Sequence, residues 1–472
     1  MKRISEDAMK EVLGGSLLRA LMIIAVPVVA NNLIQTGYNL TDTYWLGRIG
    51  TESLAAINLV TPLQNMVVSI GSGISVAGSV LIGQLLGQGR ADRARRMANQ
   101  VFTCAMLFSL TCSAVICALT PTIVRWLGAE GGVLEAGVVY LRTVILDMPF
   151  LFIVNVFQAV SQSRGNTVRP MLINLLGVLI NMALDPLLMV YLDMGAFGAA
   201  LATVGAKAAA AAVALAGLTG RKGEIRLVRA ELKPEKEYVR QIVKIGLPTA
   251  LGSGMMQFGY LLMSRNVLVY GSRAMAAYGI GNKVNGLVSM PSTAMGSATA
   301  TITALNIGAG KRDRAQRGCL LATLLSTAYL LASGLVVSRP AISGALVRIF
   351  TDDGEAAAMA ADFLSLMALW AWVNGTHDNL TGLFRGTGHT EITMVTDATR
   401  LWVFRFATLF VCERILHLGV RSVWLSVVIS NGLSAAVLYI LYRTGLWKRN
   451  RVKHARGDAE SKETENGNER TD

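Results

Sequence analysis

Long apolar stretches recur along almost the whole chain, and short polar segments separate them. Each stretch is about 20 residues or longer, enough for a helix to cross a hydrocarbon core of about 30 Å. The pattern therefore predicts an all-α membrane protein with twelve transmembrane helices. The expected spans are 17–46, 54–83, 97–119, 137–161, 170–192, 196–218, 241–270, 276–305, 318–338, 357–384, 391–412 and 420–443.

Basic residues gather in the loops that follow even-numbered spans. Arg90, Arg93, Arg95 and Arg96 follow span two, whereas the loop after span five offers only Asp193. Because short basic loops stay on the cytoplasmic side, both termini are expected in the cytoplasm. The polar first 19 residues lead into span one without a small-residue cleavage site, so this helix should be retained. We expect a multi-pass protein of the cell inner (cytoplasmic) membrane.

The two halves of the chain repeat one another. A shift of 221 residues without a gap places Pro27 on Pro248, and it places GQGRADRARR on GAGKRDRAQR. With six spans per half, this is a parallel repeat, and such transporters bind substrate between the halves. The expected organisation is a cytoplasmic N-terminus (1–16), an N-lobe (17–218), a cytoplasmic linker (219–240), a C-lobe (241–445) and a disordered cytoplasmic tail (446–472).

Composition narrows the possible functions. The chain is 53% hydrophobic and 16% charged, against about 25% charged residues in soluble proteins. Its net charge of +14 is spread between the spans, which argues against nucleic acid as a partner. The glycine-rich segments lack the Lys-Ser/Thr ending of a phosphate loop, and the five cysteines have no metal or disulfide spacing. We expect no enzyme activity and no cofactor, with an ion gradient as the energy source.

The first half carries two carboxylates inside its spans. Asp42 lies near the outer end of span one, and Asp185 lies in the outer half of span five, one turn after Asn181. Intramembrane charges are costly, so the pair is a candidate coupled site for a proton or a small cation. The alternative is that each carboxylate only accepts hydrogen bonds that lock helices together. Pro27 predicts a bend in span one, and a hinge and a fixed kink are equally consistent with it.

The second half has a different set of ionisable residues. Met263 stands at the repeat position of Asp42, so the two halves are chemically unequal. His377 beside Asp378 is either a titrating site or a packed pair, while Asp397 and Arg400, three residues apart, are expected to pair with each other. Lys207 in span six is expected to snorkel or to pair with a carboxylate. The remaining ionisable candidates of this half are Lys283 and Arg405.

Several motifs resemble the MATE (multidrug and toxic compound extrusion) family of the MOP flippase superfamily, over residues 15–445. They are N-L-T-D-T at 39–43, the Gly-x-Gly turns after spans two and eight, S-R-G-N-T at 163–167, N-M-A-L-D-P at 181–186 and G-A-A-L-A-T at 198–203. Each motif is loose, but their order and spacing are specific. The resemblance implies a V-shaped pair of six-helix lobes that exports drug-like, often cationic solutes in exchange for Na⁺ or H⁺.

The resemblance also implies a set of site residues. In the DinF-like and archaeal-like branch, a cation site lies in the N-lobe and span one bends at a proline, here Pro27. The matching cation-site residues are Asp42, Asn155, Asn181, Asp185 and Thr203. A NorM-like branch uses a Glu of span seven and an Asp of span ten; Asp378 matches the latter, but span seven has Met255, Met256 and Gln257 where the Glu would stand. We therefore expect the N-lobe site, whose oxygen ligands suit Na⁺ or a shared proton equally.

The leading hypothesis is a monomeric antiporter that works by alternating access. The expected lining of the substrate cavity, rich in polar and methionine side chains, is Gln35, Tyr38, Asn39, Gln158, Met256 and Met263, with Met255 beside them. One rival is a lipid-linked precursor flippase of the same superfamily, for which a more cationic cavity and extra helices are expected. A second rival is a non-transporting membrane receptor or assembly factor, which would not need the Asp pair.

Overall fold

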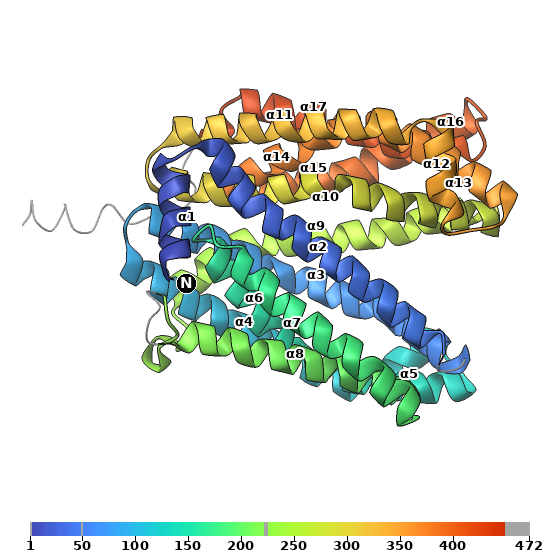
Figure 1. Ribbon diagram of the computed structural model, residues 1–472, viewed down its shortest axis with the longest axis horizontal. Helices are drawn as coiled ribbons and strands as arrows, with labels where there is room; N and C mark the ends of the chain where they lie inside the picture. The colour runs from blue at the N-terminus through green and yellow to red at the C-terminus, as the bar shows by residue number, and fades with distance from the viewer. Residues whose placement is uncertain (1, 49–50, 221–224, 449–472) are drawn as a thin grey trace, which may run out of the picture.

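The computed structural model describes residues 2–48, 51–220 and 225–448, and its described part is helical throughout (Figure 1). The elements labelled η are 3-10 helices, except η2 and η4, which are π-helices. The elements are α1 (Lys2–Gly14), α2 (Leu17–Leu46), α3 (Thr51–Gly87), α4 (Ala91–Trp126), α5 (Gly131–Val144), η1 (Ile145–Asp147), α6 (Met148–Gln162), α7 (Val168–Asp185), η2 (Pro186–Tyr191), α8 (Gly195–Thr219), η3 (Arg229–Glu231), α9 (Lys236–Leu268), α10 (Ser272–Gly308), α11 (Arg312–Val337), α12 (Pro340–Arg348), α13 (Gly354–Trp370), α14 (Trp372–Gly386), α15 (Thr390–Ala398), η4 (Thr399–Arg405), α16 (Phe406–Arg414), α17 (Arg421–Arg443) and η5 (Leu446–Lys448).

The helices form two lobes arranged as a V (Figure 1). The N-lobe comprises α2–α8 and the C-lobe comprises α9–α17. The lobes meet at the end of the molecule where α1 lies, here named the closed end, and they diverge toward the opposite, open end. The prediction of an all-α, twelve-span, two-lobe fold is confirmed. The short helix α12 was not expected.

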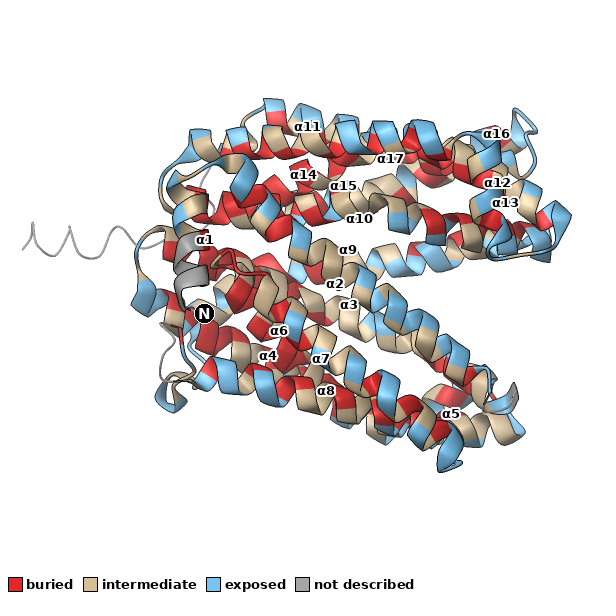
Figure 2. Ribbon diagram, viewed as in Figure 1, coloured by how far each residue is buried: buried red, intermediate tan, exposed pale blue. Residues whose placement is uncertain are grey.

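Eight helices of the described chain are long and apolar enough to span a membrane. The pair α13–α14 is bent by 57° and counts as a ninth when its two helices are taken as one broken span. Helices α9 and α10 are also long enough but less apolar, and the segment 390–414 is divided among α15, η4 and α16. Buried residues line the contacts between helices, while many large apolar side chains face outward, as a lipid environment requires (Figure 2).

Four glycines show the repeat at atomic level. Gly89 and Gly310, which the shift of 221 residues superposes, have φ of 74° and 75°. Gly165 and Gly388, which follow the equivalent α6 and α14, have φ of 73° and 85°. Each lies one residue before a backbone N–H that bonds back to the carbonyl five residues earlier, which is the Schellman ending of a helix.

The two lobes approach each other closely at the closed end. A Cβ atom on Gly87 would lie 2.1 Å from the Leu305 carbonyl oxygen, and one on its repeat partner Gly308 would lie 2.1 Å from that of Gln84. The buried Gln84 side chain also donates a 2.8 Å hydrogen bond to the Gly386 carbonyl. Backbone contact between α3 and α10 is therefore possible only because both positions are glycine.

The N-terminal segment is a helix rather than only a polar extension. Asn306 and Arg314 of the C-lobe donate to the Val12 carbonyl at 3.3 and 2.9 Å, and Lys311 donates to the Leu13 carbonyl at 2.8 Å. These bonds satisfy carbonyls that the last turn of α1 leaves without intrahelical partners. Val12 also reaches the N-lobe beside Gly165, so α1 joins the two lobes at the closed end.

The segment between the lobes is bound to α4. Asn99 accepts from the Val228 N–H at 2.8 Å, Gln100 donates to the Glu231 and Lys233 carbonyls at 2.8 and 2.7 Å, and Glu231 pairs with Arg95 at 2.9 Å. Helix α9 begins at Lys236, within the expected linker. At the other end of the C-lobe the expected tail begins inside η5, where Trp447 is buried, and its residues 449–472 lie outside the described residues.

Candidate functional site

Pro27 interrupts the hydrogen bonding of α2, as the sequence predicts. A proline has no N–H, so the Ile23 carbonyl one turn earlier loses its helical partner. The hydroxyl of buried Thr167, at the start of α7, lies 3.4 Å from that carbonyl oxygen and 3.0 Å from that of Ile24. The proline position of α2 is thus braced by the S-R-G-N-T segment.

Asp185 lies at the junction of two kinds of helix. It is the last residue of α7, and the π-helical η2 begins at Pro186. Proline lacks the donor that would continue α-helical bonding, and π segments inside helices occur frequently at functional sites. The local sequence Asp-Pro therefore explains why the backbone changes beside this carboxylate.

The side chains of Asp185 and Asn181 are buried next to each other in the N-lobe. Asp185 is 0% exposed and Asn181 is 3% exposed. Among the described residues, neither carboxylate oxygen of Asp185 and neither amide atom of Asn181 makes a hydrogen bond of ordinary geometry, although the Asn181 amide lies close enough to the Asp185 carboxylate to interact with it. Buried polar groups are nearly always satisfied, so this pair of side chains is a candidate place for a further partner, such as a proton or an ion.

Helix α2 brings further polar groups to this point. Asp42, four residues before the end of α2, lies within electrostatic range of Asp185. Tyr38, one turn earlier, lies near both carboxylates, and its hydroxyl meets that of Thr203 on α8. Four of the expected site residues therefore converge in the N-lobe: Asp42, Asn181, Asp185 and Thr203.

Asn155 is an expected ion-site residue for which the described structure shows no hydrogen bond to the two carboxylates. It is half-buried on α6, which packs against α7 and α8. Within the described part of the chain, no hydrogen bond joins its amide to Asp42 or Asp185. Its role as an ion ligand remains a prediction.

A third carboxylate, Asp147, lies in the N-lobe and was not singled out from the sequence. It is 0% exposed in η1, and its Oδ2 accepts from the Lys207 ammonium and, at 3.2 Å, from the Gln64 amide. Pairing with a carboxylate is thus the arrangement that Lys207 adopts. The signal was present, because Asp147 is an ionisable residue inside an expected span and Lys207 needs a counter-charge.

The C-lobe ionisable residues form a separate cluster centred on Asp397. Its Oδ1 lies 3.4 Å from Nε2 of His377 and 3.3 Å from Arg400, and its Oδ2 lies 3.9 Å from Arg385. Asp378 lies 3.6 Å from Nδ1 of His377 and accepts a 2.8 Å hydrogen bond from Ser292. The expected pairing of Asp397 with Arg400 is present, with His377 between the two carboxylates.

Arg405 is held by polar groups of α17. Its guanidinium is 3% exposed and donates to Ser430 Oγ and Asn431 Oδ1, both at 3.1 Å. It also lies over the Tyr260 ring, 6.0 Å from the centroid. These contacts fix η4 against α17. Lys283 is exposed on α10.

The expected substrate-lining residues differ in how accessible they are. Gln35 and Asn39 are exposed on one face of α2, 3.5 Å apart, and Tyr38 and Gln158 are half-buried. Met256 lines a pocket of about 260 Å³ where α3 meets α9, α14 and α15. Met263 is instead 0% exposed in the C-lobe core, which removes it from the cavity lining in this conformation.

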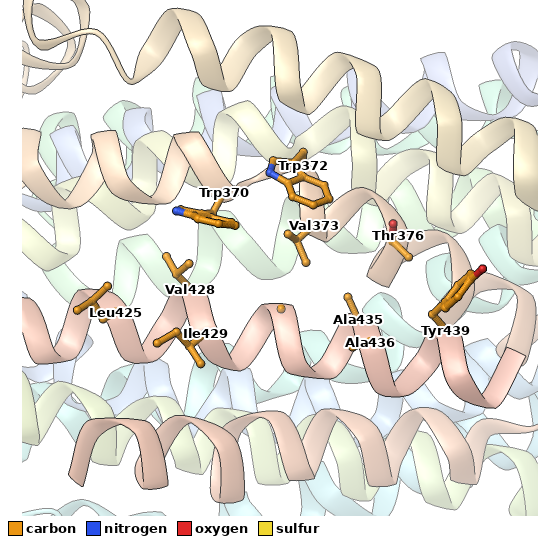
Figure 3. A pocket seen from close by; sticks show the side chains of 11 residues that line it. Trp370, Trp372, Val373, Thr376, Leu425, Val428, Ile429, Ala435, Ala436 and Tyr439 are labelled. Atoms are coloured by element: carbon orange, nitrogen blue, oxygen red, sulfur yellow. The ribbon is translucent and has the colours of Figure 1, made fainter. Parts of the chain in front are cut away.

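A larger groove of about 570 Å³ lies between α14 and α17 (Figure 3). Its walls are aromatic and aliphatic, with Trp370, Trp372 and Tyr439 the largest side chains. Among the residues that the structure describes, no Asp, Glu, Lys or Arg lines it. The groove is suited to apolar chains, and the hydroxyls of Thr376 and Tyr439 are among its few polar groups.

Comparison with known protein families assigns the chain. The MatE family model matches residues 27–187 and 248–411, which are most of the two lobes. The chain belongs to the MatE family. It is therefore a multi-pass membrane transporter and not an enzyme.

Curated relatives align over nearly the full length of this MatE protein. The chain is 25% identical over 446 residues to the probable multidrug resistance protein YoeA of Bacillus subtilis, covering 93% of this chain and 96% of the relative. It is 23% identical over 443 residues to the probable multidrug resistance protein NorM of Thermotoga maritima, with coverages of 92% and 94%. It is 24% identical over 371 residues to the multidrug export protein MepA of Staphylococcus aureus, with coverages of 78% and 82%.

Solved structures share the fold. A crystal structure of MATE in complex with MaL6 superposes with a TM-score of 0.87 at 22% identity, covering 92% of this chain and 97% of the other. A MOP superfamily transporter from Pyrococcus furiosus, described as having a binding pocket of reverse polarity, gives a TM-score of 0.86 at 22% identity, with coverages of 93% and 98%. The V-shaped arrangement of lobes is thus that of MATE transporters.

Proposed function

We propose that this MatE transporter exports small organic, drug-like and often cationic solutes in exchange for H⁺ or Na⁺. The proposal draws on the relatives, whose names describe multidrug resistance and multidrug export. It also draws on the V-shaped lobes, because transporters built from two parallel repeats bind substrate between them and alternate its access to the two sides. Both termini, with α1 at the closed end, would then face the cytoplasm.

The burial of the Asp185 carboxylate is the observation that carries the ion-coupled part of the proposal. A fully buried carboxylate whose oxygens make no hydrogen bond of ordinary geometry among the described residues is costly unless something neutralises it. Asn181 and Asp42 supply further oxygens beside it, and Thr203 supplies a hydroxyl. Hard oxygen ligands suit Na⁺, and two adjacent carboxylates also suit one shared proton.

The coupling would act through α2. Asp42 and the candidate substrate-lining residues Gln35, Tyr38 and Asn39 lie on the same helix, beyond Pro27. Neutralising Asp42 and Asp185 removes their repulsion, so α2 gains freedom to bend at the proline and to change its contacts with the substrate. A cationic substrate and the coupling ion would compete for the same negative charge, which is the requirement for exchange.

Ethidium efflux from proteoliposomes tests the proposal, with a Na⁺ gradient and a pH gradient imposed separately. We expect one gradient to drive efflux by the wild type, and Asp42→Asn and Asp185→Asn to lower it about a hundredfold or more. The matched control is Asp193→Asn, because Asp193 is exposed in a turn at φ 50° and asparagine tolerates that conformation. This variant should transport normally.

Two results would overturn the proposal. Full gradient-driven efflux in both Asp variants would show that the pair does not couple an ion. Absence of efflux by folded wild type under either gradient would favour the lipid-linked precursor flippase instead, which a fluorescent polyprenyl-phosphate translocation assay would then detect.

A further inference from the structure

Lys207 is a cation in the interior of the N-lobe. Its ammonium pairs with Asp147, yet its side chain keeps 31% of its surface exposed, whereas that of Asp147 has none. The carboxylate is therefore fixed inside the packed lobe, while the lysine reaches it from the accessible side. Lysine carries its charge on a flexible four-carbon stem, so the ammonium has freedom that the carboxylate lacks.

The hydrogen bonding of the Asp147 carboxylate that pairs with this lysine is incomplete. Its Oδ2 accepts from both Lys207 and Gln64, but its buried Oδ1 has no partner among the described residues. A buried ion pair is most stable when every remaining lone pair is satisfied. The pair at Asp147 therefore lacks the full set of hydrogen bonds expected of a purely structural lock.

The same lysine faces the candidate ion site. It lies one turn after Thr203 on α8, and its ammonium is within electrostatic range of Asp42. Tyr140 of α5 is within electrostatic range of Asp42, Asp147 and Asp185 together. The three carboxylates thus share one region of the lobe, and Lys207 is the ammonium beside them.

We propose that Lys207 is a tethered cation that exchanges between Asp147 and the Asp42–Asp185 pair during the transport cycle. While Asp147 holds the ammonium, as in this structure, Asp42 and Asp185 are free to take the coupling ion. When that ion leaves, the ammonium turns toward the pair and compensates its charge. Lys207 is thus a positioning residue for ion exchange, and this inference rests on the proposed coupling at Asp42 and Asp185.

Charge counting shows why the position of the single ammonium matters. Three carboxylates and one ammonium leave the region two charges negative, and bound Na⁺ or a proton removes only one. The other groups that face the region are the hydroxyls of Tyr38, Tyr140 and Thr203 and the amides of Gln64 and Asn181, none of which is cationic. After the ion leaves, Lys207 is the group at hand that can limit the repulsion between Asp42 and Asp185.

The discriminating variant is the double change Lys207→Met/Asp147→Asn. It removes both charges of the pair, so the net charge of the lobe is unchanged and neither group is left buried without its partner. Thermal unfolding in detergent establishes that it is folded. Ethidium binding, gradient-driven efflux and the release of H⁺ or Na⁺ on ethidium addition are then measured, each as a function of pH.

If Lys207 is a tethered cation, the folded double variant binds ethidium within about threefold of wild type but loses about tenfold or more of its gradient-driven turnover. Its pH profile of ion release also shifts. Lys207→Arg should lower kcat with little change in KM, because a forked guanidinium binds the fixed Asp147 more firmly. Wild-type turnover and pH profile in the double variant would overturn the inference.

The two proposals fail separately. If Asp42→Asn and Asp185→Asn abolish coupling while the double variant behaves as wild type, only the inference on Lys207 is wrong. If the Asp variants remain coupled, the proposed site itself is wrong.

Discussion

The hydroxyl of Thr167 donates a 3.0 Å hydrogen bond to the backbone carbonyl of Ile24. The equivalent contact exists in the other lobe, where Thr390 donates to the Ile245 carbonyl at 2.8 Å, three residues before Pro248. Both threonines are buried and both begin the helix after a glycine turn. Each lobe thus braces its proline-bearing helix through the same pair of positions, which the internal repeat relates.

The brace at Thr167 predicts an effect on both stability and transport. Thr167→Val keeps the shape of the side chain but removes the hydroxyl beside the Ile23 carbonyl, which Pro27 leaves without a helical donor. The loss costs about 1 kcal/mol. We expect a lower unfolding temperature in detergent, and a change of about fivefold in the equilibrium between straight and bent α2. The measurement is thermal unfolding together with ethidium turnover in proteoliposomes.

Thr167→Ser is the matched control, because it keeps the hydroxyl. Equal unfolding temperatures and equal ethidium turnover in the Val and Ser variants would show that the contact with Ile24 does not restrain α2. Thr390→Val should lower stability in the same way, but it should leave ion release unchanged because it acts on the C-lobe.

The glycine contact between the lobes predicts a shift in conformation. A methyl group at Gly308 would overlap the Gln84 backbone, and overpacking of this kind costs about 1–3 kcal/mol. Because the contact exists only while the lobes meet at the closed end, Gly308→Ala should favour the conformation in which that end is open. Labelling of a cysteine introduced at Gln88 reports this opening, after the five native cysteines have been replaced.

Gly286→Ala is the control for this experiment. It adds the same methyl group to the same helix, α10, at a position with nothing within 4 Å. Its labelling rate should match that of the background protein. Equal rates in the two alanine variants would show that the glycine contact does not decide the closure.

The pattern of the sequence was sufficient to predict the architecture. Apolar runs of membrane-spanning length and a constant offset of 221 residues specify twelve spans in two equivalent lobes, because both signals are carried by many positions. Asp42 and Asp185 were recognisable for a different reason, since each is a charged residue where charge is costly. Their convergence with Asn181 and Thr203 follows from helices packed as neighbours.

Contacts that depend on the rotation of helices could not be predicted in this way. Met263 aligns with Asp42 in the repeat, yet it faces the C-lobe core, because a small rotation of α9 decides between core and cavity. Asp147 was overlooked beside the more regular spans, although its need for Lys207 was a usable signal. Docking of α1 depends on backbone carbonyls, which leave no trace in a pattern of side chains.

Asp353 predicts a dependence of stability on pH at the open end. Its carboxylate accepts from the N–H groups of Ala356 and Glu355 at the start of α13 and pairs with Arg273. The Ala356 N–H, followed by the Glu355 N–H and Arg273, lowers the pKa of Asp353. Because the pKa of Asp353 is lowered in the folded state, its carboxylate contributes fully to stability when the pH is above the ordinary pKa of about 4. That stability is lost as the pH falls through the lowered pKa of the folded state.

The difference in unfolding temperature between wild type and Asp353→Asn isolates this contribution. Asparagine still caps the helix but does not titrate, so wild type should be the more stable protein at pH 7 and lose that advantage below about pH 4. A difference that stays constant across this range would show that the charge of Asp353 is not what stabilises the α10–α13 contact.

The arrangement around Asp397 predicts that this residue stabilises the C-lobe. Asp397→Asn leaves the Arg400 guanidinium without its counter-charge, and removing one partner of a buried ion pair costs about 3–5 kcal/mol. Asp362→Asn is a fitting comparison, because Asp362 pairs with Arg421 at 2.9 Å on the surface, where such pairs contribute about 1 kcal/mol or less. Denaturant titration in detergent micelles measures both. Because the loss arises from an unpaired charge, combining Asp397→Asn with Arg400→Met should recover part of the free energy of unfolding. Equal losses for Asp397→Asn and Asp362→Asn would show that the cluster is not a structural ion pair.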